Sequence, residues 1–468
     1  MVILRRIFKS PFGPLYDEGG LSQSLRRSLR FIILGNLFGN IFFNMTQGSA
    51  LTGFAGVLGA NDFVFGVLMA IPLFGTLMQL PAAMIVSRAG KRKKFMMTYG
   101  VIARASWIVV GLVPYFVPIA PHWLRLWSVI FLVGISSLGG SFINVCFTPW
   151  LADLVPLHIR GRWISCRDRI ISLIGVGVGI GTAAILDFMP GYNGYAVVFI
   201  LGGVLGVADM LCFLGADETP MAKADDTKLI PVMKQACKDK RFFSFMMFWT
   251  AWAFATNFGG AFVMRYALGP MRLSFLEATL TGQVAAAVIT VFVISGWGRV
   301  MDRYGSKPVL MISCFMGCLT PAILLFASPG VAVVFLLFNV IGATFWSAFN
   351  LAAVNMSMSC SPTDRRAAYI ALFSCVTNLF GAFFGVLLGG AVLEWLPILL
   401  PPISTGGLPD QYKIVFILSI ILRLLAVFLL IPKLQNDRES SIHELAADLK
   451  EWLKDLKSKR PRLRLRRF

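Results

Sequence analysis

Charged residues are scarce in this chain, and histidines are scarcer. Only 14% of the 468 residues are charged, 57% are hydrophobic, and three are histidines. The mean hydropathy is +0.74. A charge content this low excludes a soluble globular fold, in which about a quarter of the residues are charged. The sequence therefore predicts a protein whose main solvent is lipid.

Patterns typical of enzymes and metal sites are also missing. The sequence shows no Ser/His/Asp set, no cluster of metal ligands and no phosphate-binding loop, so we expect neither enzyme activity nor a cofactor. The eight cysteines fall in predicted helices or on the cytoplasmic side, so we expect no disulfides. Cys314 and Cys318 share one helix face and are interpreted as small packing thiols.

Long polar segments are few, and apolar segments long enough to cross a membrane as helices lie between them. We count twelve, at about 29–55, 63–86, 95–117, 124–151, 168–188, 194–215, 242–264, 274–297, 308–328, 330–356, 367–393 and 411–432. The longest polar interruption divides them six and six. The predicted organisation is a cytoplasmic N-terminal segment (1–28), a six-helix bundle (29–216), a cytoplasmic linker (217–241), a second six-helix bundle (242–432) and a cytoplasmic tail (433–468).

Acidic residues are outnumbered by basic ones, 23 to 43, which gives a net charge of +20. The basic residues cluster at alternate junctions between apolar segments, a positive-inside pattern that places both termini and the linker in the cytoplasm. We expect no nucleic-acid partner. The N-terminal stretch lacks the features of a cleaved signal peptide. We expect a multi-pass protein of a plasma membrane, such as the cytoplasmic membrane of a bacterium.

The tail contains an amphipathic pattern followed by a basic stretch. "SIHELAADLKEWLKDL" begins with a capping box, Ser441 to Glu444, and places its apolar residues on one face. "KSKRPRLRLRRF" follows it. The pattern predicts a helix on the inner leaflet and a tail attracted to anionic lipids. A solvated helix is the alternative.

The two halves of the chain repeat each other at three places. "AMIVSRAGKRK" at 83–93 and "GRVMDRYGSKP" at 298–308 follow the second helix of each half. "PLHIRGRW" at 156–163 and "PTDRRAAY" at 362–369 follow the fourth, and "YAVVFIL" from Tyr195 and "YKIVFIL" from Tyr412 open the sixth. Three matches in the same order indicate an internal repeat, which is typical of secondary transporters.

The first of these repeats resembles the loop signature of the major facilitator superfamily. The second-half copy has Gly298, Asp302, Arg303, Gly305 and Lys307 in that register, and the first-half copy keeps Arg88, Gly90, Lys91 and Arg92. The resemblance implies an all-α membrane protein with twelve helices in two pseudo-symmetric six-helix bundles. It also implies a transporter that works by rocker-switch alternating access, which we expect to be a monomer.

The sequence departs from the family pattern in two ways. Ser87 and Ala83 stand where the family usually has aspartate and glycine, so the first-half loop is expected to hold less firmly. The Gly-Pro signature of drug/proton antiporters in the fifth helix is also missing, because "GVGVGIG" at 175–181 has the glycines without the proline.

The loop and the second repeat predict a gate on the cytoplasmic side. Asp302 could hold the start of the fifth helix, where Arg167 and Arg169 lie, and this contact would exist only in the outward-open state. The alternative is that these charges merely fix the topology. The predicted gating set is Arg88, Gly90, Arg160, Arg167, Arg169, Gly298, Asp302, Arg303, Gly305 and Arg366.

Polar side chains inside the predicted helices indicate a binding site. Four amides lie on one face of the first helix, and further amides and tryptophans lie on the fourth, seventh and tenth helices. In the family resembled, these four helices line the central cavity. The predicted solute-binding set is Asn36, Asn40, Asn44, Gln47, Asn144, Trp249, Trp252, Asn257, Trp346 and Asn350. The alternative is interhelical packing, since amides commonly join membrane helices.

Some charges also lie within predicted helices. Arg104 and Asp209 lie about 12–15 Å from the cytoplasmic edge at about 1.5 Å per residue, which makes them candidates for a buried ion pair. Arg423 has no partner that the sequence identifies. Arg265 and Glu277 fall near outer helix ends, where an outer gate or simple solvation could explain them.

These features favour a secondary transporter of a small polar solute, such as a sugar, a polyol or another neutral or zwitterionic molecule. Its partners would be that solute and the lipid bilayer. An exporter of amphiphilic compounds or drugs is the alternative with the same fold, and a non-transporting receptor is the alternative from another class. No carboxylate stands alone in a predicted cavity-lining helix, so coupling to a proton or sodium ion is not evident and facilitated diffusion stays open.

Overall fold

The computed structural model describes residues 22–116, 121–218, 235–360, 366–399 and 410–434. Within these ranges every regular element is helical and there is no β-strand. By length and composition, ten of the helical segments could each cross a membrane. Residues 1–21, most of the predicted linker and the predicted tail helix with its lipid-binding stretch lie outside the described residues.

Six membrane-crossing units form the first half. The first was predicted as one helix, but it breaks at Gln47 and Gly48, where Gly48 has a φ of +62°, a value that favours glycine. In chain order the units are α3 (Gln23–Thr46) with α4 (Ser49–Val57), α5 (Asp62–Gly75) with α6 (Gln79–Ala89), α7 (Arg92–Phe116), α8 (His122–Leu154), α9 (Leu157–Phe188) and α10 (Tyr192–Cys212).

Six further units form the second half, and two of them contain π-helical turns, which often mark functional sites. The turns are Leu280–Val284 and Thr377–Phe383. In chain order the units are α12 (Lys240–Gly260) with α13 (Val263–Leu268), α14 (Phe275–Thr279) with α15 (Ala285–Tyr304), α16 (Ser306–Leu319), α17 (Ala332–Ser359), α18 (Arg366–Val376) with α19 (Phe384–Leu399), and α20 (Asp410–Leu430).

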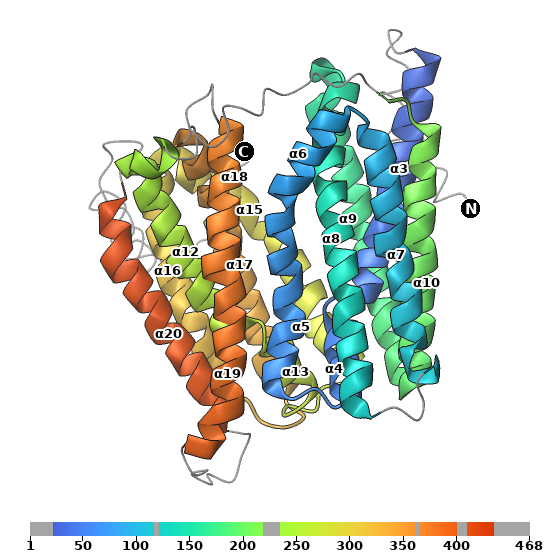
Figure 1. Ribbon diagram of the computed structural model, residues 1–468. Helices are drawn as coiled ribbons and strands as arrows, with labels where there is room; N and C mark the ends of the chain where they lie inside the picture. The colour runs from blue at the N-terminus through green and yellow to red at the C-terminus, as the bar shows by residue number, and fades with distance from the viewer. Residues whose placement is uncertain (1–21, 117–120, 219–234, 361–365, 400–409, 435–468) are drawn as a thin grey trace, which may run out of the picture.

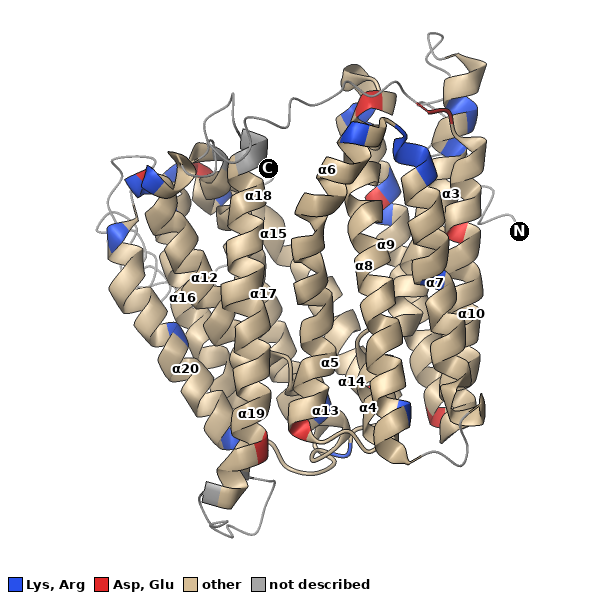
Figure 2. Cartoon of the chain, in the orientation of Figure 1, with Lys and Arg blue, Asp and Glu red and all other residues tan. Residues whose placement is uncertain are grey.

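The two halves form two helix bundles that lie side by side (Figure 1). Most charged residues gather at one end of the bundles (Figure 2), which includes the loops at 88–94 and 299–307 and which we call the basic end. We call the opposite end the distal end. One apolar core, with Phe54 and Phe199 from the first half and Phe262 and Tyr266 from the second, joins the halves at the distal end. At the basic end each half has a core of its own.

The two repeated loops share two structural features, although the ψ angles of their glycines differ, at 16° for Gly90 and 175° for Gly305. Gly90 and Gly305 have φ values of +66° and +85°, so both positions favour glycine. Two or three residues after each glycine, a lysine side chain contacts the end of the sixth helix of the same half. The ammonium of Lys93 donates to the carbonyl oxygen of Ala216 at 2.5 Å, and that of Lys307 donates to the carbonyl oxygen of Leu434 at 2.5 Å. Each loop therefore ties the start of a third helix to the end of a sixth.

Candidate functional site

A cavity lies inside the second half and adjoins a space between the halves. The larger part, about 670 Å³, is lined by residues of α12, α15, α16, α17 and α20. The smaller part, about 430 Å³, lies between α3 and α9 of the first half and α12 to α17 of the second. Both parts are lined by Gly260, Val263, Ala286 and Asn339, so they adjoin. These volumes suit a small molecule.

The cavity is closed toward the distal end, where the shared apolar core joins the halves. Toward the basic end, the lining side chains Ile294 and Val354 are 45% and 51% exposed. Val354 lies in the last two turns of α17, and Ile294 lies near the middle of α15. At the basic end each half has a core of its own, which is the arrangement expected of a cavity that opens in that direction.

A chain of three amides crosses from the first half to the second in the smaller part of the cavity. The Gln283 Nε2 atom donates to Asn44 Oδ1 at 2.8 Å, and the Asn44 Nδ2 atom donates to Asn40 Oδ1 at 3.1 Å. Gln283 lies in the π-helical turn of the second half. Each amide still has hydrogen-bonding groups that a solute could use.

Two glycines of α9 allow this chain of amides to form. A Cβ atom at Gly175 would lie 2.7 Å from Asn40 Oδ1, and one at Gly179 would lie 2.8 Å from Gln283 Oε1. Both distances are shorter than side chains tolerate, so a larger residue would displace an amide. Two of the four glycines in this stretch of α9 are therefore explained by close packing of the helix against the amides, whereas a Cβ atom at Gly177 or Gly181 would meet no other atom within 4 Å.

The residues of the predicted solute-binding set lie in different surroundings. Asn44, Gln47, Trp346 and Asn350 line the cavity, and Asn40 lies behind Asn44. The others do not line it. Asn257 donates to the Ala253 carbonyl oxygen at 2.8 Å, Asn36 is partly buried with its Nδ2 atom unbonded, and Asn144 is exposed.

The predicted tryptophans Trp249 and Trp252 belong to the packing core of the second half. Both are buried, at 8% and 2% exposed, and their rings stack on Phe349 at centroid distances of 4.8 and 5.4 Å. Trp346 stacks on the other side of this group at 4.9 Å and reaches the cavity. The other aromatic side chains of the cavity wall are phenylalanines that the sequence did not single out, namely Phe43, Phe335 and Phe338.

A buried arginine lies in the wall of the larger part of the cavity. Arg423 of α20 is 7% exposed. Its Nη1 atom donates to the Gly317 carbonyl oxygen at 2.8 Å and its Nη2 atom to the Thr256 carbonyl oxygen at 3.4 Å. All three residues line the cavity. The described residues provide no carboxylate partner for this guanidinium.

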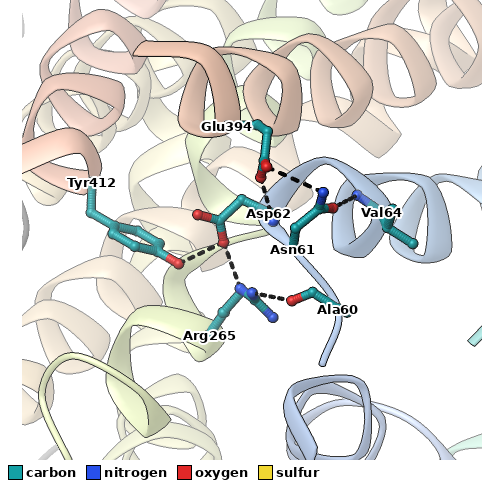
Figure 3. A network of polar contacts seen from close by, with 7 residues as sticks. All are labelled: Ala60, Asn61, Asp62, Val64, Arg265, Glu394 and Tyr412. Atoms are coloured by element: carbon teal, nitrogen blue, oxygen red, sulfur yellow. Dashed lines mark hydrogen bonds and ion pairs between the residues drawn. The ribbon is translucent and has the colours of Figure 1, made fainter. Parts of the chain in front are cut away.

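The halves are joined at the distal end by a polar network, shown in Figure 3, that we call the distal gate. The Arg265 Nε atom lies 2.6 Å from Asp62 Oδ1, and the Tyr412 hydroxyl donates to the same oxygen at 2.9 Å. Glu394 accepts from the backbone N–H of Asp62 at 3.1 Å and from the Asn61 amide at 3.2 Å. Arg265 is therefore not simply solvated but joins the two halves, as the predicted outer gate would require.

A second carboxylate makes the equivalent contact in the opposite direction. Asp187, at the end of α9, accepts from the backbone N–H groups of Phe275 and Leu276 at 2.9 and 2.8 Å. It thereby caps the first turn of α14, as Glu394 caps the first turn of α5. Glu277, the other residue that the sequence left open, completes a capping box with Ser274 in its own helix.

Two of the residues predicted to gate the basic end form contacts within the first half. Arg160 donates to carbonyl oxygens at the end of α8, those of Ala152 and Val155. Arg167 lies 2.8 Å from Asp168, its neighbour in α9. The predicted contact of Asp302 with the start of α9 belongs to the state in which the basic end is closed, so it stays a prediction.

The remaining residues of the predicted gating set lie at the basic end. Gly90 and Gly305 have the positive φ values given above, and Gly298 is part of α15. Arg366 begins α18, but its side chain lies outside the described residues. Exposed side chains at this end include Arg88, Arg169, Asp302 and Arg303.

Arg104 and Asp209 lie together behind the cavity. The Arg104 Nη2 atom is 3.2 Å from Asp209 Oδ2, and the guanidinium lies 4.0 Å from the centroid of the Phe42 ring. Two glycines leave room for this group, because a Cβ atom at Gly39 would lie 2.8 Å from Asp209 and one at Gly206 would lie 3.0 Å from Arg104.

Sequence reasoning missed several residues of the cavity and the distal gate. Gln283 and Asn339 are single amides in apolar segments. Each could have been noticed as a polar residue inside a membrane helix, but neither belongs to one of the sequence repeats. The two acidic caps have a clearer signal, because Asp187 in "ILDF" and Glu394 in "VLEW" occupy equivalent places at the ends of the fifth and eleventh helices.

Comparison with known sequences identifies one family. The model described as Major Facilitator Superfamily matches residues 33–297 and 284–465. A comparison with curated protein sequences gives no match.

Comparison with solved structures finds transporters with the same fold. The nucleoside transporter NupG aligns with a TM-score of 0.63 at 16% identity, covering 88% of this chain and 99% of that one. The xylose transporter XylE from E. coli in an inward open conformation aligns with a TM-score of 0.62 at 16% identity, covering 90% and 99%. A bacterial homologue of the iron transporter ferroportin in an inward-facing state aligns with a TM-score of 0.62 at 17% identity, covering 88% and 99%.

Proposed function

The chain belongs to the major facilitator superfamily, and from this premise we propose that it is a secondary transporter of a small polar solute, a molecule that binds mainly through hydrogen bonds. The family establishes a membrane transporter. The nature of the solute is proposed from the cavity.

One observation carries the proposal, namely the amides that both halves contribute to a single cavity. Asn44 and Gln47 come from the first half, and Gln283, Asn339 and Asn350 come from the second. Amides both donate and accept hydrogen bonds, so such a wall recognises hydroxyl and carbonyl groups. A solute bound there contacts both halves, as alternating access requires.

The positive-inside pattern places the basic end in the cytoplasm. With that orientation, a cavity open toward the basic end and closed at the distal gate corresponds to an inward-facing state. Transport then requires that the distal gate opens while the loops at the basic end close. The Asp302 latch is the proposed contact that stabilises the closed basic end.

An exporter of amphiphilic compounds is less well supported. Such a cavity would be expected to have mainly aromatic walls, and Phe43, Phe335 and Phe338 do line this one. However, Trp249 and Trp252 pack into the core, and amides from both halves interrupt the apolar wall. Trp346 is the tryptophan that lines it. Polar-solute transporters among the structural neighbours, for nucleosides and xylose, agree with the proposal.

Uptake of labelled sugars, polyols, nucleosides, organic acids and lipophilic cations into liposomes that contain the purified protein tests this function. Asn44→Ala and Asn339→Ala should each weaken solute binding by about 1–3 kcal/mol, because each removes a hydrogen-bonding partner from the cavity wall. Asn193→Ala is the matched control, since Asn193 is bonded to Tyr115 outside the cavity. Preference for lipophilic cations, or equal affinity in all variants, would contradict the proposal.

A further inference from the structure

Arg423 is the feature of the cavity that the transport function has not yet explained. It lies 13 residues after the first residue of α20, Asp410, and seven before the last, Leu430, so it is about 20 Å from one end of the helix and about 10 Å from the other at about 1.5 Å per residue. A charge at such a depth is costly unless it is paired, and intramembrane charges commonly mark substrate pathways. This arginine is therefore expected to have a partner.

The described residues leave this cation only partly satisfied. Two backbone carbonyl oxygens accept from its terminal nitrogens, whereas the buried Nε atom has no hydrogen-bond partner. The hydroxyl of Thr256, beside it in the cavity wall, is also buried without a partner. A guanidinium N–H and a hydroxyl that both lack partners at one place have the donors that an oxygen anion needs. Protein atoms cover both groups in this state, so an anion reaches them only after a movement of the cavity wall.

The charges around Arg423 indicate which charge a bound solute would need in order to neutralise its guanidinium. Among the described residues, those that line either part of the cavity include no aspartate or glutamate. The described lining residues contain a single positive charge, Arg423. A phosphate monoester carries about −1.5 to −2 at neutral pH. One carboxylate, with a charge of −1, balances one guanidinium and accepts two parallel hydrogen bonds from it.

We propose that Arg423 binds a carboxylate of the transported solute and that the solute is a small hydroxylated monocarboxylate, of the hydroxy-acid or sugar-acid class. The amides of the adjoining part bind the hydroxyl groups, and Arg423 with Thr256 binds the carboxylate. The inference rests on the proposed transport function and narrows its solute from polar molecules in general to acids.

Compounds that differ mainly in charge test this assignment. Two sets are suitable, namely glucose, gluconate and glucose phosphate, and glycerol, glycerate and glycerol phosphate. Binding is measured as the rise in melting temperature of the purified full-length protein, and transport as uptake into liposomes. The carboxylate of at least one set should bind and be transported, and its neutral and phosphorylated counterparts should bind roughly tenfold more weakly or worse.

Variants then locate the carboxylate. Arg423→Gln should weaken binding of the carboxylate by roughly 10- to 150-fold, and Arg423→Lys should weaken it less, because lysine keeps the charge without the planar pair of donors. Thr256→Val should weaken it by several-fold, roughly as one hydrogen bond contributes. Thr250→Val is the matched control, since the Thr250 hydroxyl donates to the Met246 carbonyl oxygen in the same helix away from the cavity. The melting temperature without solute shows whether each variant folds.

The outcomes separate the inference from the function on which it rests. Transport of a neutral solute that Arg423→Gln leaves unchanged would overturn the inference and leave the transporter of polar solutes standing. Preference for the phosphorylated compounds would overturn the carboxylate assignment. Wild-type affinity for the carboxylate in Arg423→Gln and Thr256→Val would show that both residues have only a structural role in helix packing and do not bind the solute. Absence of uptake for every compound would contradict both proposals.

Discussion

Asp62→Asn should favour opening of the distal gate. Asp62 receives an ion pair from Arg265 and a hydrogen bond from Tyr412, both from the other half. The side chains of Arg265 and Asp62 are only 17% and 13% exposed, so the pair is largely shielded from water. Asparagine keeps the shape and one acceptor oxygen but removes the charge. The substitution therefore tests the ion pair with little disturbance of the packing.

The size of the effect depends on the fact that the Arg265–Asp62 ion pair forms only in the state in which the distal end is closed. A hydrogen bond between charged groups contributes about 1.5–3 kcal/mol when shielded, and we expect the lower end because the amide oxygen still accepts. In the state with an open distal end both groups are hydrated, so that state changes little. The ratio of closed to open molecules should therefore fall roughly tenfold, with an upper limit of about 150-fold.

Distances between spin labels at the distal ends of the two halves measure this ratio. His122 and Ser328 are exposed there in different halves, and cysteines at these positions can be labelled after the eight native cysteines have been replaced. The longer distances should gain population in Asp62→Asn. Asp168→Asn is the control, because Asp168 pairs with Arg167 within one helix at the basic end. An unchanged distribution in Asp62→Asn, or an equal change in the control, would refute the reasoning.

Three further predictions concern other parts of the molecule. Removing either Arg104 or Asp209 should destabilise the protein by about 3–5 kcal/mol and removing both should restore part of the loss, whereas additive losses of melting temperature would show that the pair contributes nothing. Gly179→Ala should weaken solute binding, because the added Cβ atom would lie 2.8 Å from Gln283 Oε1, and unchanged binding would show that the amide moves freely. Asp302→Asn should shift the population toward molecules open at the basic end, and labels on the basic ends of α9 and α15 would show no shift if the aspartate only fixes the topology.

Much of the fold could be predicted from the sequence, because hydropathy and charge act over whole segments. Twenty apolar residues in a row have few alternatives to a membrane helix, and the repeated loops indicated the arrangement of the halves. The break at Gly48 was missed because one glycine does not lower the hydropathy of a segment. The π-helical turn at Gln283 was missed because it depends on packing rather than on composition.

The candidate site was harder to predict, because a helix face that lines a cavity and one that packs against another helix have similar compositions. The spacing of Asn36, Asn40 and Asn44 placed the three on one face, but the structure brings Asn44 alone of them into the cavity wall. Trp249 and Trp252 were likewise expected to line the cavity, but their rings stack on Phe349 in the core of the second half. Which side of a helix faces the cavity depends on how its neighbours are tilted. The tilt cannot be derived from the sequence of one helix alone.

The two acidic caps of the distal gate show how pseudo-symmetry serves reversible closure. Asp187 of the first half caps α14 of the second, and Glu394 of the second half caps α5 of the first. Opening separates both carboxylates from their backbone N–H groups, but water then reaches all of these groups. Each lost hydrogen bond therefore changes the free energy by only about 0.5–1.5 kcal/mol, rather than by the larger penalty of a buried unbonded group. A gate of several such contacts holds one end closed by a few kcal/mol, which the binding of one solute can offset. Replacing either cap with an apolar contact of equal area would stabilise one state and should slow transport.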